Sequence, residues 1–542
     1  MVLRFLERRE IFLCFQTGKF FKSNLSKNNK NHYFCWSENL GSLMNKILIP
    51  VFLILSLYFN LSAEEKEPSP VYPIPTKQQL AWQDMEMYAF LHYSINTYTD
   101  QEWGFGNEDP ALFNPENLDV KQWVEVCKNS GMTGIILTAK HHCGFCLWPS
   151  EFTDYSVKNS PWKNGKGDVV AELSQACREA GLKFAVYLSP WDRNFKDYGS
   201  AEYIDYFRNQ LGELLTNYGD IFEIWFDGAN GGNGWYGGAN EVRKIDRKTY
   251  YQWPETFRMI RELQPDIVIW NDGSSRGDLR WVGTEAGYVG ETNWSLLNSE
   301  GVVSRDMLHY GLENGDRWVP GETNTSIRPG WFYHASEDTK VKSLSRLVDT
   351  YYKSVGRNST LLLNFPVMPS GRIHPLDSLR GSLFKKYIDN AFSENLIYGS
   401  KVTASSVRNN DDRYSACNVA DEDRNSYWAT DEGIISASLL IEFPENKTFN
   451  RFLVEEYIPL GQRVKRFSLQ VFEDGEWKDL KDELTENGDG LTTIGHRRII
   501  CFPEVTADKI RFTIEDSKSS PLISKIGIFN APPIEEDEEE TI

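Results

Sequence analysis

Short apolar runs alternate with amphipathic segments over roughly the middle three fifths of the chain, from residue 72 to residue 395. Each apolar run is followed by a segment in which apolar residues recur every three or four positions. In one such segment Tyr203, Phe207, Leu211 and Leu214 recur at helical spacing. This alternation of strands and helices is typical of a parallel sheet with crossover helices.

The number of apolar runs along the chain indicates the type of parallel sheet. We expect strands at residues 89–93, 134–139, 184–188, 222–226, 267–270, 281–282, near 330–333, and at 361–365, and helices at 120–129, 169–180, 203–218 and 344–354. Roughly eight such units predict an α/β fold, a (β/α)8-like TIM barrel over residues 72–395. In such a barrel the functional side chains lie at the carboxyl ends of the strands.

A different pattern begins beyond residue 396. Short alternating strands, such as residues 466–472 and 509–514, are separated by turn residues. This pattern predicts an all-β domain over residues 397–530. The acidic residues 531–542 that follow are interpreted as a solvated tail.

The amino-terminal region has the pattern of an export signal. A short basic start at Met44, an apolar run over residues 47–59 and a small-residue end at Ala63 predict a signal peptide at 44–63. We interpret residues 1–43 as a non-native extension from an over-early start codon. A cytoplasmic extension before a membrane anchor is the alternative, but the run is short for a spanning helix. We therefore expect an exported protein, periplasmic or secreted, with no stable membrane span in its mature form.

Composition restricts the ligand class. Asp and Glu number 77 against 58 Lys and Arg, which gives a net charge of -19, and no basic patch suits a polyanion. Nucleic acid is therefore excluded as an expected partner. Aromatic residues make up 13% of the chain, including 17 Trp. Sugar rings stack on such side chains, although packing in the core is the alternative use.

The cysteines do not form a recognisable metal or disulfide pattern. Cys143 and Cys146 have C-x-x-C spacing but no second pair follows, and the remaining cysteines are widely spaced. We therefore expect no catalytic metal and no required cofactor.

Polar residues that can carry chemistry stand at or just after the predicted strands, so the barrel should bring them to one end. They are His92, His141, Tyr187, Asp227, Asn271 and Glu285. A single histidine at a strand end is often structural, and Asp227 before Gly228 could simply form a turn. His141 and His142 would point to opposite faces of a strand, so a functional role for both requires a loop or bulge there.

Several separated motifs resemble one enzyme family. In chain order they are Phe90-Leu91-His92, Glu102-Trp103, Ala139-Lys140-His141-His142-Cys143-Gly144-Phe145, Trp225-Phe226-Asp227-Gly228 and Leu361-Leu-Leu-Asn364. Together they resemble glycoside hydrolase family 29, the α-L-fucosidases, over residues 72–395.

The resemblance implies a role for each matching residue. Asp227 would be the nucleophile that forms a glycosyl-enzyme intermediate. Phe90 and Trp331 would line the apolar corner for the C5 methyl group of fucose. The implied ligands of the fucose hydroxyls are His92, Glu102, Trp103, His141, His142, Tyr187 and Trp225.

These residue types suit the reaction that the family performs. A retaining hydrolase needs an ionised carboxylate to attack the anomeric carbon and a protonated carboxyl group to protonate the leaving oxygen. Fucose presents several hydroxyls and one methyl group. Neutral His, Trp N–H and carboxylate groups for the hydroxyls, with an aromatic wall for the methyl group, make a selective pocket.

The general acid is assigned from a second resemblance. Residues 280–287 resemble the acid/base segment of the subgroup that prefers branched α-1,3 and α-1,4 fucosides, with Thr284 where Asn is usual. This makes Glu285 the acid, and Glu291 its competitor. The Gly-rich insert after Asp227 is interpreted as a loop on the aglycone side, with Trp235 and Tyr236 available for stacking.

The carboxyl-terminal domain resembles another known class. Residues 416–421, 427–429, 439–443 and 464–471 resemble discoidin or coagulation-factor C domains, which are jelly-roll sandwiches related to carbohydrate-binding modules. In similar domains, loops such as residues 418–428 can hold a structural Ca²⁺.

The sequence therefore predicts an exo-acting retaining α-L-fucosidase that acts on terminal α-1,3- or α-1,4-linked fucose of oligosaccharides or glycoconjugates. Two alternatives remain open. A fucose-binding lectin could use the same pocket without catalysis, although both candidate carboxylates are retained. A barrel glycosidase for another sugar is the second alternative.

Overall fold

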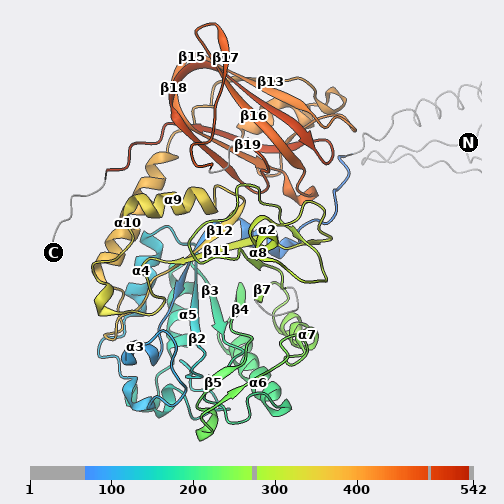
Figure 1. Ribbon diagram of the computed structural model, residues 1–542. Helices are drawn as coiled ribbons and strands as arrows, with labels where there is room; N and C mark the ends of the chain where they lie inside the picture. The colour runs from blue at the N-terminus through green and yellow to red at the C-terminus, as the bar shows by residue number, and fades with distance from the viewer. Residues whose placement is uncertain (1–66, 272–276, 486–489, 536–542) are drawn as a thin grey trace, which may run out of the picture. The chain divides into compact units, whose positions relative to one another are not determined.

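The computed structural model describes residues 67–271, 277–485 and 490–535 (Figure 1). The predicted signal peptide at 44–63 and the segment 1–43 lie outside the described residues, as does the tail beyond residue 535. Within the described ranges, no helix has both the length and the apolar character that a membrane crossing requires.

A barrel of parallel strands forms the first part of the described chain. Its eight-stranded sheet has the order β7-β4-β3-β2-β1-β12-β11-β8. Leu279, just before β8, makes a parallel bridge with Trp270 of β7, so the two edge strands meet and nearly close the barrel. This confirms the predicted TIM-like fold. The strands are β1 Met87–Leu91, β2 Gly134–Lys140, β3 Lys183–Leu188, β4 Glu223–Phe226, β7 Val268–Asn271, β8 Arg280–Trp281, β11 Gly321–Ser326 and β12 Ser359–Asn364.

Helices cover the outer face of the barrel. Asp119 and Asp168 accept hydrogen bonds from the first turns of α4 and α5, which fixes the starts of these two helices. Apolar residues at helical spacing then bury one side of α4 and one side of α5 against the strands. The helices are α2 Lys77–Gln83, α3 Asn96–Thr99, α4 Val120–Asn129, α5 Val169–Ala180, α6 Ala201–Asn217, α7 Trp253–Leu263, α8 Arg305–Tyr310, α9 Leu344–Ser354 and α10 Pro375–Ala391.

The prediction of a strand at residues 330–333 is wrong. The seventh strand is β11, and residues 330–333 lie in the loop beyond its carboxyl end. Its sequence, GETNTS, has no apolar run, yet every residue in it is buried. Neighbouring strands satisfy its polar groups: the Thr323 and Ser359 hydroxyls lie 2.8 Å apart, and Asn364 donates to Ser326 at 2.9 Å.

The second part is an antiparallel all-β domain, as predicted. Register shifts in β15 between Glu442 and Lys447, and again between Phe449 and Arg451, bend this long strand so that it contributes along its whole length to a curved sheet. Its inner positions form an apolar core. The strands are β13 Lys401–Ala404, β14 Trp428–Ala429, β15 Ala437–Glu456, β16 Val464–Glu473, β17 Glu476–Asp479, β18 Arg498–Ser517 and β19 Leu522–Phe529.

The β domain contacts the barrel through buried polar groups and a shared apolar core. Gln462 accepts a hydrogen bond from the Ser295 amide at 2.8 Å and donates to the Asn293 carbonyl at 3.0 Å. Phe529 of β19 packs against Phe392, just after α10, with ring centroids 5.0 Å apart. The β domain therefore completes the hydrogen bonds of the barrel segment around residue 293, which also bonds to Arg357 and Asn358 of the barrel.

Candidate active site

A pocket opens at the carboxyl ends of the barrel strands. Its volume is about 170 Å³, and it contains the nominated nucleophile, the preferred acid Glu285 and all the implied fucose ligands, whereas Asn271, which also follows a strand, is not in the lining. Asn324 of β11 completes the lining and was not predicted, because it lies on the polar strand that the pattern did not reveal. The lining residues are Phe90, His92, Glu102, Trp103, His141, His142, Tyr187, Trp225, Asp227, Glu285, Asn324 and Trp331.

Asp227, the nominated nucleophile, directly follows β4. Its Oδ2 accepts a hydrogen bond from the Tyr187 hydroxyl at 3.3 Å and lies 3.8 Å from Nε2 of His142. Its side chain is 38% exposed. Gly228 has φ +74°, and a Cβ there would lie 2.3 Å from the His142 ring. The Asp-Gly turn thus also allows a histidine to approach the carboxylate.

The two consecutive histidines both reach the pocket because the strand ends before them. β2 stops at Lys140, after an irregularity in its pairing beyond Thr138. His141 stacks on Tyr187 with an interplanar angle of 16°, and Nδ1 of His142 lies 2.7 Å from the Ser189 hydroxyl. The loop that a double role requires is therefore present.

The pocket histidines are neutral. Burial lowers the pKa of His92 and of His142 to about 3, and it lowers the pKa of His141 well below its usual value. The amide nitrogen of Asn364 donates to Ser326 and to the Trp331 carbonyl, so its oxygen faces His92 at 2.8 Å. His92 therefore carries its proton on Nδ1 and presents Nε2 as an acceptor.

Glu102 fixes the loop that carries Trp331. One carboxylate oxygen accepts the Trp331 amide at 3.0 Å, and the other accepts the Phe332 amide at 3.0 Å and approaches Nε2 of His334 at 2.8 Å. Burial lowers the pKa of His334, but hydrogen bonds to Asp100 and Glu102 outweigh it and raise this pKa. Sequence reasoning missed His334, which stands in a loop with no periodic signal.

Aromatic rings form the pocket wall. Phe90 meets Trp225 edge-to-face at 5.0 Å and Trp331 at 6.2 Å. Trp225 stacks on Trp270 with centroids 3.6 Å apart, and its N–H donates to the buried Glu322 at 2.9 Å. Trp225 thus offers a ligand its ring rather than the N–H group considered from the sequence.

The structure separates the two candidate acids. Glu285 is in the lining, where it accepts a hydrogen bond from Nε1 of Trp331 at 3.2 Å. Helix α8 holds its segment, because Arg305 donates to the Gly283 carbonyl at 2.8 Å. Glu291 does not line the pocket, and its carbonyl accepts a hydrogen bond from Arg498 of the β domain at 2.9 Å. Glu285 therefore lines the pocket, whereas the backbone of Glu291 lies at the domain contact.

The prediction that Tyr236 is available for stacking on a substrate is wrong. Its ring is buried and stacks on Tyr198 with an interplanar angle of 6°. Its hydroxyl accepts a hydrogen bond from Trp191 at 2.9 Å. The Gly-rich insert folds back on the barrel because its glycines allow close backbone packing, and Trp235 lies outside the pocket lining.

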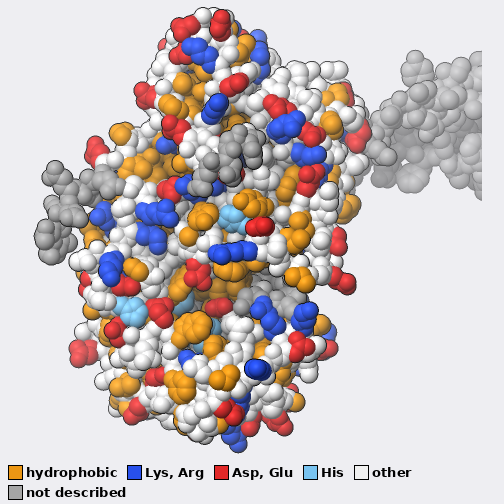
Figure 2. Space-filling model, viewed as in Figure 1, with side chains coloured by type: hydrophobic (Ala, Val, Ile, Leu, Met, Phe, Trp, Pro, Cys, Tyr) orange, Lys and Arg blue, Asp and Glu red, His pale blue; other side chains and the backbone are white. Residues whose placement is uncertain are grey.

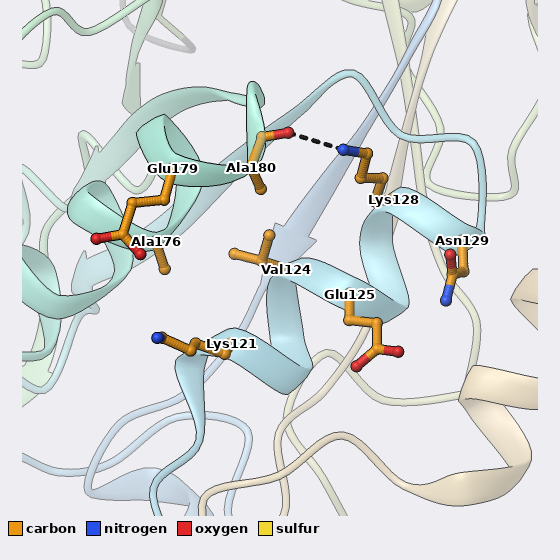
Figure 3. A pocket seen from close by; sticks show the side chains of 8 residues that line it. All are labelled: Lys121, Val124, Glu125, Lys128, Asn129, Ala176, Glu179 and Ala180. Atoms are coloured by element: carbon orange, nitrogen blue, oxygen red, sulfur yellow. Dashed lines mark hydrogen bonds between the residues drawn. The ribbon is translucent and has the colours of Figure 1, made fainter.

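A second hollow lies between α4 and α5 on the outside of the barrel (Figure 3). Its charged side chains, such as Lys121, Glu125 and Glu179, are exposed, and Lys128 donates to the Ala180 carbonyl at 2.9 Å. No buried ionisable group lines it, so this groove offers no chemistry comparable to that of the barrel pocket.

A barrel whose pocket joins the carboxylates of Glu102, Asp227 and Glu285, from loops at the ends of the strands, to neutral histidines and aromatic rings is typical of a glycoside hydrolase. The family model for alpha-L-fucosidase matches residues 70–381, and the F5/8 type C domain model matches residues 401–526. The chain therefore belongs to the α-L-fucosidase family, glycoside hydrolase family 29.

Relatives match over nearly all of the described chain. Alpha-L-fucosidase 1 of Arabidopsis thaliana is 41% identical over 88% of this chain and 92% of its own length. A crystal structure of a glycoside hydrolase 29 family member from an unknown rumen bacterium is 65% identical, covering 87% of this chain and 80% of that one, with a TM-score of 0.79. A Ruminococcus gnavus fucosidase solved in complex with fucose is 31% identical, covering 86% and 97%, with a TM-score of 0.76.

Proposed function

We propose that this protein is an exo-acting retaining α-L-fucosidase. The observation that carries the proposal is the meeting of Asp227 and Glu285 in one pocket, from loops that follow different strands. The bound fucose of the Ruminococcus gnavus relative and the name of the Arabidopsis thaliana relative support fucose as the sugar.

The reaction follows from the two carboxyl groups. Asp227 attacks the anomeric carbon while Glu285 gives its proton to the leaving glycosidic oxygen, so the old bond breaks as the glycosyl ester forms. Glu285 then takes a proton from water, which attacks the anomeric carbon and releases Asp227. Two displacements return the original anomeric configuration.

The uncharged side chains that line the pocket recognise the sugar. His92 presents an acceptor nitrogen, and a neutral histidine can also offer one donor, so the histidines match sugar hydroxyls without a buried charge. Phe90 and Trp331 form the apolar corner for the C5 methyl group. Polar groups beside an aromatic corner favour a 6-deoxy sugar over its hydroxylated analogue.

Aryl glycosides test the sugar, and the first-formed anomer tests the mechanism. We expect rapid release from aryl α-L-fucoside and negligible release from aryl galactosides, with α-L-fucose as the first product detected by NMR. Initial β-L-fucose would rule out retention. Fucose binding without turnover would favour the lectin alternative, and faster galactoside cleavage would favour another sugar.

The linkage preference is part of the same proposal. The resemblance of residues 280–287 to the branched-substrate subgroup favours α-1,3- and α-1,4-linked fucose on fucosylated oligosaccharides or glycoconjugates. We expect a Lewis trisaccharide to be cleaved faster than α-1,2-fucosyllactose. Equal rates on the two substrates would contradict the subgroup assignment.

We also propose that the enzyme is exported and does not act on nucleic acid. The pattern at residues 44–63 supports export. On the face seen in Figure 2, Lys and Arg side chains are interspersed with Asp and Glu rather than gathered into one basic patch. Fractionation of cells that express the full chain tests export, and retention in the cytoplasm would contradict it.

A further inference from the structure

A pair of carboxyl groups lies inside the barrel, nearer the amino ends of the strands than the pocket is. Glu223 is the first residue of β4 and Glu322 the second residue of β11, and both are fully buried. Among the described residues, neither forms an ion pair. Buried carboxylates are costly unless they are paired or neutralised, so this arrangement needs a physical account.

The hydrogen bonds show which carboxyl group is ionised. Glu322 accepts from two donors, the Tyr88 hydroxyl at 2.5 Å and the Trp225 N–H at 2.9 Å. Glu223 accepts from one, the Trp82 N–H at 3.0 Å, and its other oxygen has no donor among the described residues. The two carboxyl groups belong to one buried network, because the Trp82 N–H contacts Glu223 and also the Tyr88 hydroxyl, at 3.1 Å, which in turn donates to Glu322. Two carboxyl groups held together without a cation favour the state in which one of them carries a proton.

Glu223 is the natural carrier of that proton. Its second oxygen has no hydrogen-bond donor among the described residues and can carry the proton, whereas both oxygens of Glu322 already accept hydrogen bonds. Burial and the neighbouring carboxylate raise the pKa of Glu223 well above its usual value, in agreement with the hydrogen bonds.

Trp225 connects this pair to the pocket. Its ring lines the pocket and stacks between Trp270 at 3.6 Å and Tyr187 at 5.6 Å. Stacking fixes the plane of the indole, but the ring can still slide or turn within that plane. The hydrogen bond from its N–H to Glu322 removes that freedom. Trp225 stands two residues before Asp227, so its position is coupled to that of the nominated nucleophile.

We propose that Glu223 and Glu322 share one proton at neutral pH. In the same proposal Glu322 is a positioning residue, which fixes the orientation of the Trp225 ring where it contacts the sugar. The positioning role rests on the proposed fucosidase function, whereas the shared proton does not. Glu322 touches no substrate in this scheme, since Trp225 lies between it and the pocket.

Three substitutions test the positioning role. Glu322→Leu removes both acceptors, and we expect the KM for aryl α-L-fucoside to rise about tenfold, the effect of losing one hydrogen bond of about 1.4 kcal/mol. We expect kcat to change less. Glu322→Gln restores one acceptor and should recover part of the loss. Glu223→Gln is the matched control, because its amide donates where the proton did, and its KM should stay within about twofold of wild type.

Infrared spectroscopy tests the proton without any substrate. At neutral pH, the difference between wild type and Glu223→Gln should show the carbonyl band of a protonated carboxyl group. Absence of that band overturns the shared proton, and an equal rise of KM in Glu223→Gln and Glu322→Gln overturns the division of roles. If wild type fails to cleave the fucoside, the proposed function fails, while the infrared band still decides the protonation of the pair.

Discussion

The barrel pocket and the sandwich loop around residue 423 both gather polar side chains, but they satisfy them differently. In the loop, exposed Asp421 accepts hydrogen bonds from Ser426 at 2.7 Å and from the Asp423 amide at 2.9 Å, all within one turn. In the pocket, Asp227 and His142 come from different strands. Polar groups that converge in a pocket from separate strands can bind and transform a ligand, whereas locally satisfied ones stabilise a turn.

The strongest test of this difference is Asp227→Asn. An amide cannot form the glycosyl ester, so we expect turnover to fall by more than about 10⁴-fold, because removal of the nucleophile in a covalent mechanism can cost about 10⁶ in kcat. Fucose binding, measured by calorimetry, should persist. The matched control is Asp220→Asn, an exposed residue just before the amino end of the same strand, which should leave turnover unchanged. Near wild-type activity in Asp227→Asn would remove the nucleophile assignment.

The second test concerns the acid. Glu285→Ala should slow natural oligosaccharides by about 10²–10³-fold, because a basic leaving oxygen needs a proton, and should affect activated aryl fucosides far less. Azide should partly restore deglycosylation, since it attacks the ester without general-base help.

Glu291→Ala is the control for this measurement, because Glu291 lies at the domain contact. If Glu291→Ala shows the leaving-group signature and Glu285→Ala does not, the acid assignment moves to Glu291.

The sequence predicts those elements whose signal is local. Helices α4 and α5 have their predicted bounds because apolar periodicity and an aspartate cap coincide at each. Strand β11 was missed because it consists of a glycine and five polar residues, which are satisfied by partners from distant segments, as when Asn364 donates to Ser326. Burial of such a strand is a property of the assembled sheet and leaves no apolar pattern.

The site residues also fall into those that the sequence reveals and those that only the structure reveals. Asp227 and His141 are found from sequence because each directly follows a strand and stands in a recognisable motif. Glu322 and His334 are not, because their roles depend on Trp225 and Glu102, which lie far away along the chain. The neutral state of the pocket histidines could be inferred only from the structure, because burial is its cause.

A third test addresses what the β domain contributes. Gln462→Ala leaves the buried Ser295 amide without its partner and removes one of two donors to the Asn293 carbonyl, which keeps Asn358 at 2.9 Å. The free energy of unfolding should fall by about 1–3 kcal/mol. Denaturant unfolding should remain a single transition, because barrel and β domain share a core. Gln470→Ala, on an exposed pair with Asp479, is the control and should cost less than about 0.5 kcal/mol. Two separate transitions would show that the domains are independent.

A fourth test uses pH. The pKa of His142 is about 3 in the folded protein and about 6.5 when unfolded, so below pH 6.5 the unfolded state binds a proton that the folded state does not. The free energy of unfolding should therefore fall as pH drops from 6.5 toward 3, with about 1.4 kcal/mol lost at pH 5.5 from this residue. His142→Gln should remove that slope relative to wild type, and above pH 7.5 the difference between the two proteins should be constant. Parallel curves from pH 7.5 to 5 would show that His142 is not buried as a neutral group.

The smallest expected effect is that of chelation. Two carboxyl groups suffice for a double displacement, so we expect EDTA to leave turnover of aryl α-L-fucoside unchanged. The Asp421 turn completes its hydrogen bonds within its own segment. A structural Ca²⁺ at residues 418–428, which the resemblance to discoidin domains leads us to expect, remains a proposal. Thermal unfolding with and without added Ca²⁺ separates the two regions: a shift in the midpoint with constant turnover assigns the ion to the sandwich. Activity lost on chelation and restored by a divalent ion, with no change in the unfolding midpoint, would instead assign a metal to the barrel pocket and contradict the two-carboxylate reaction.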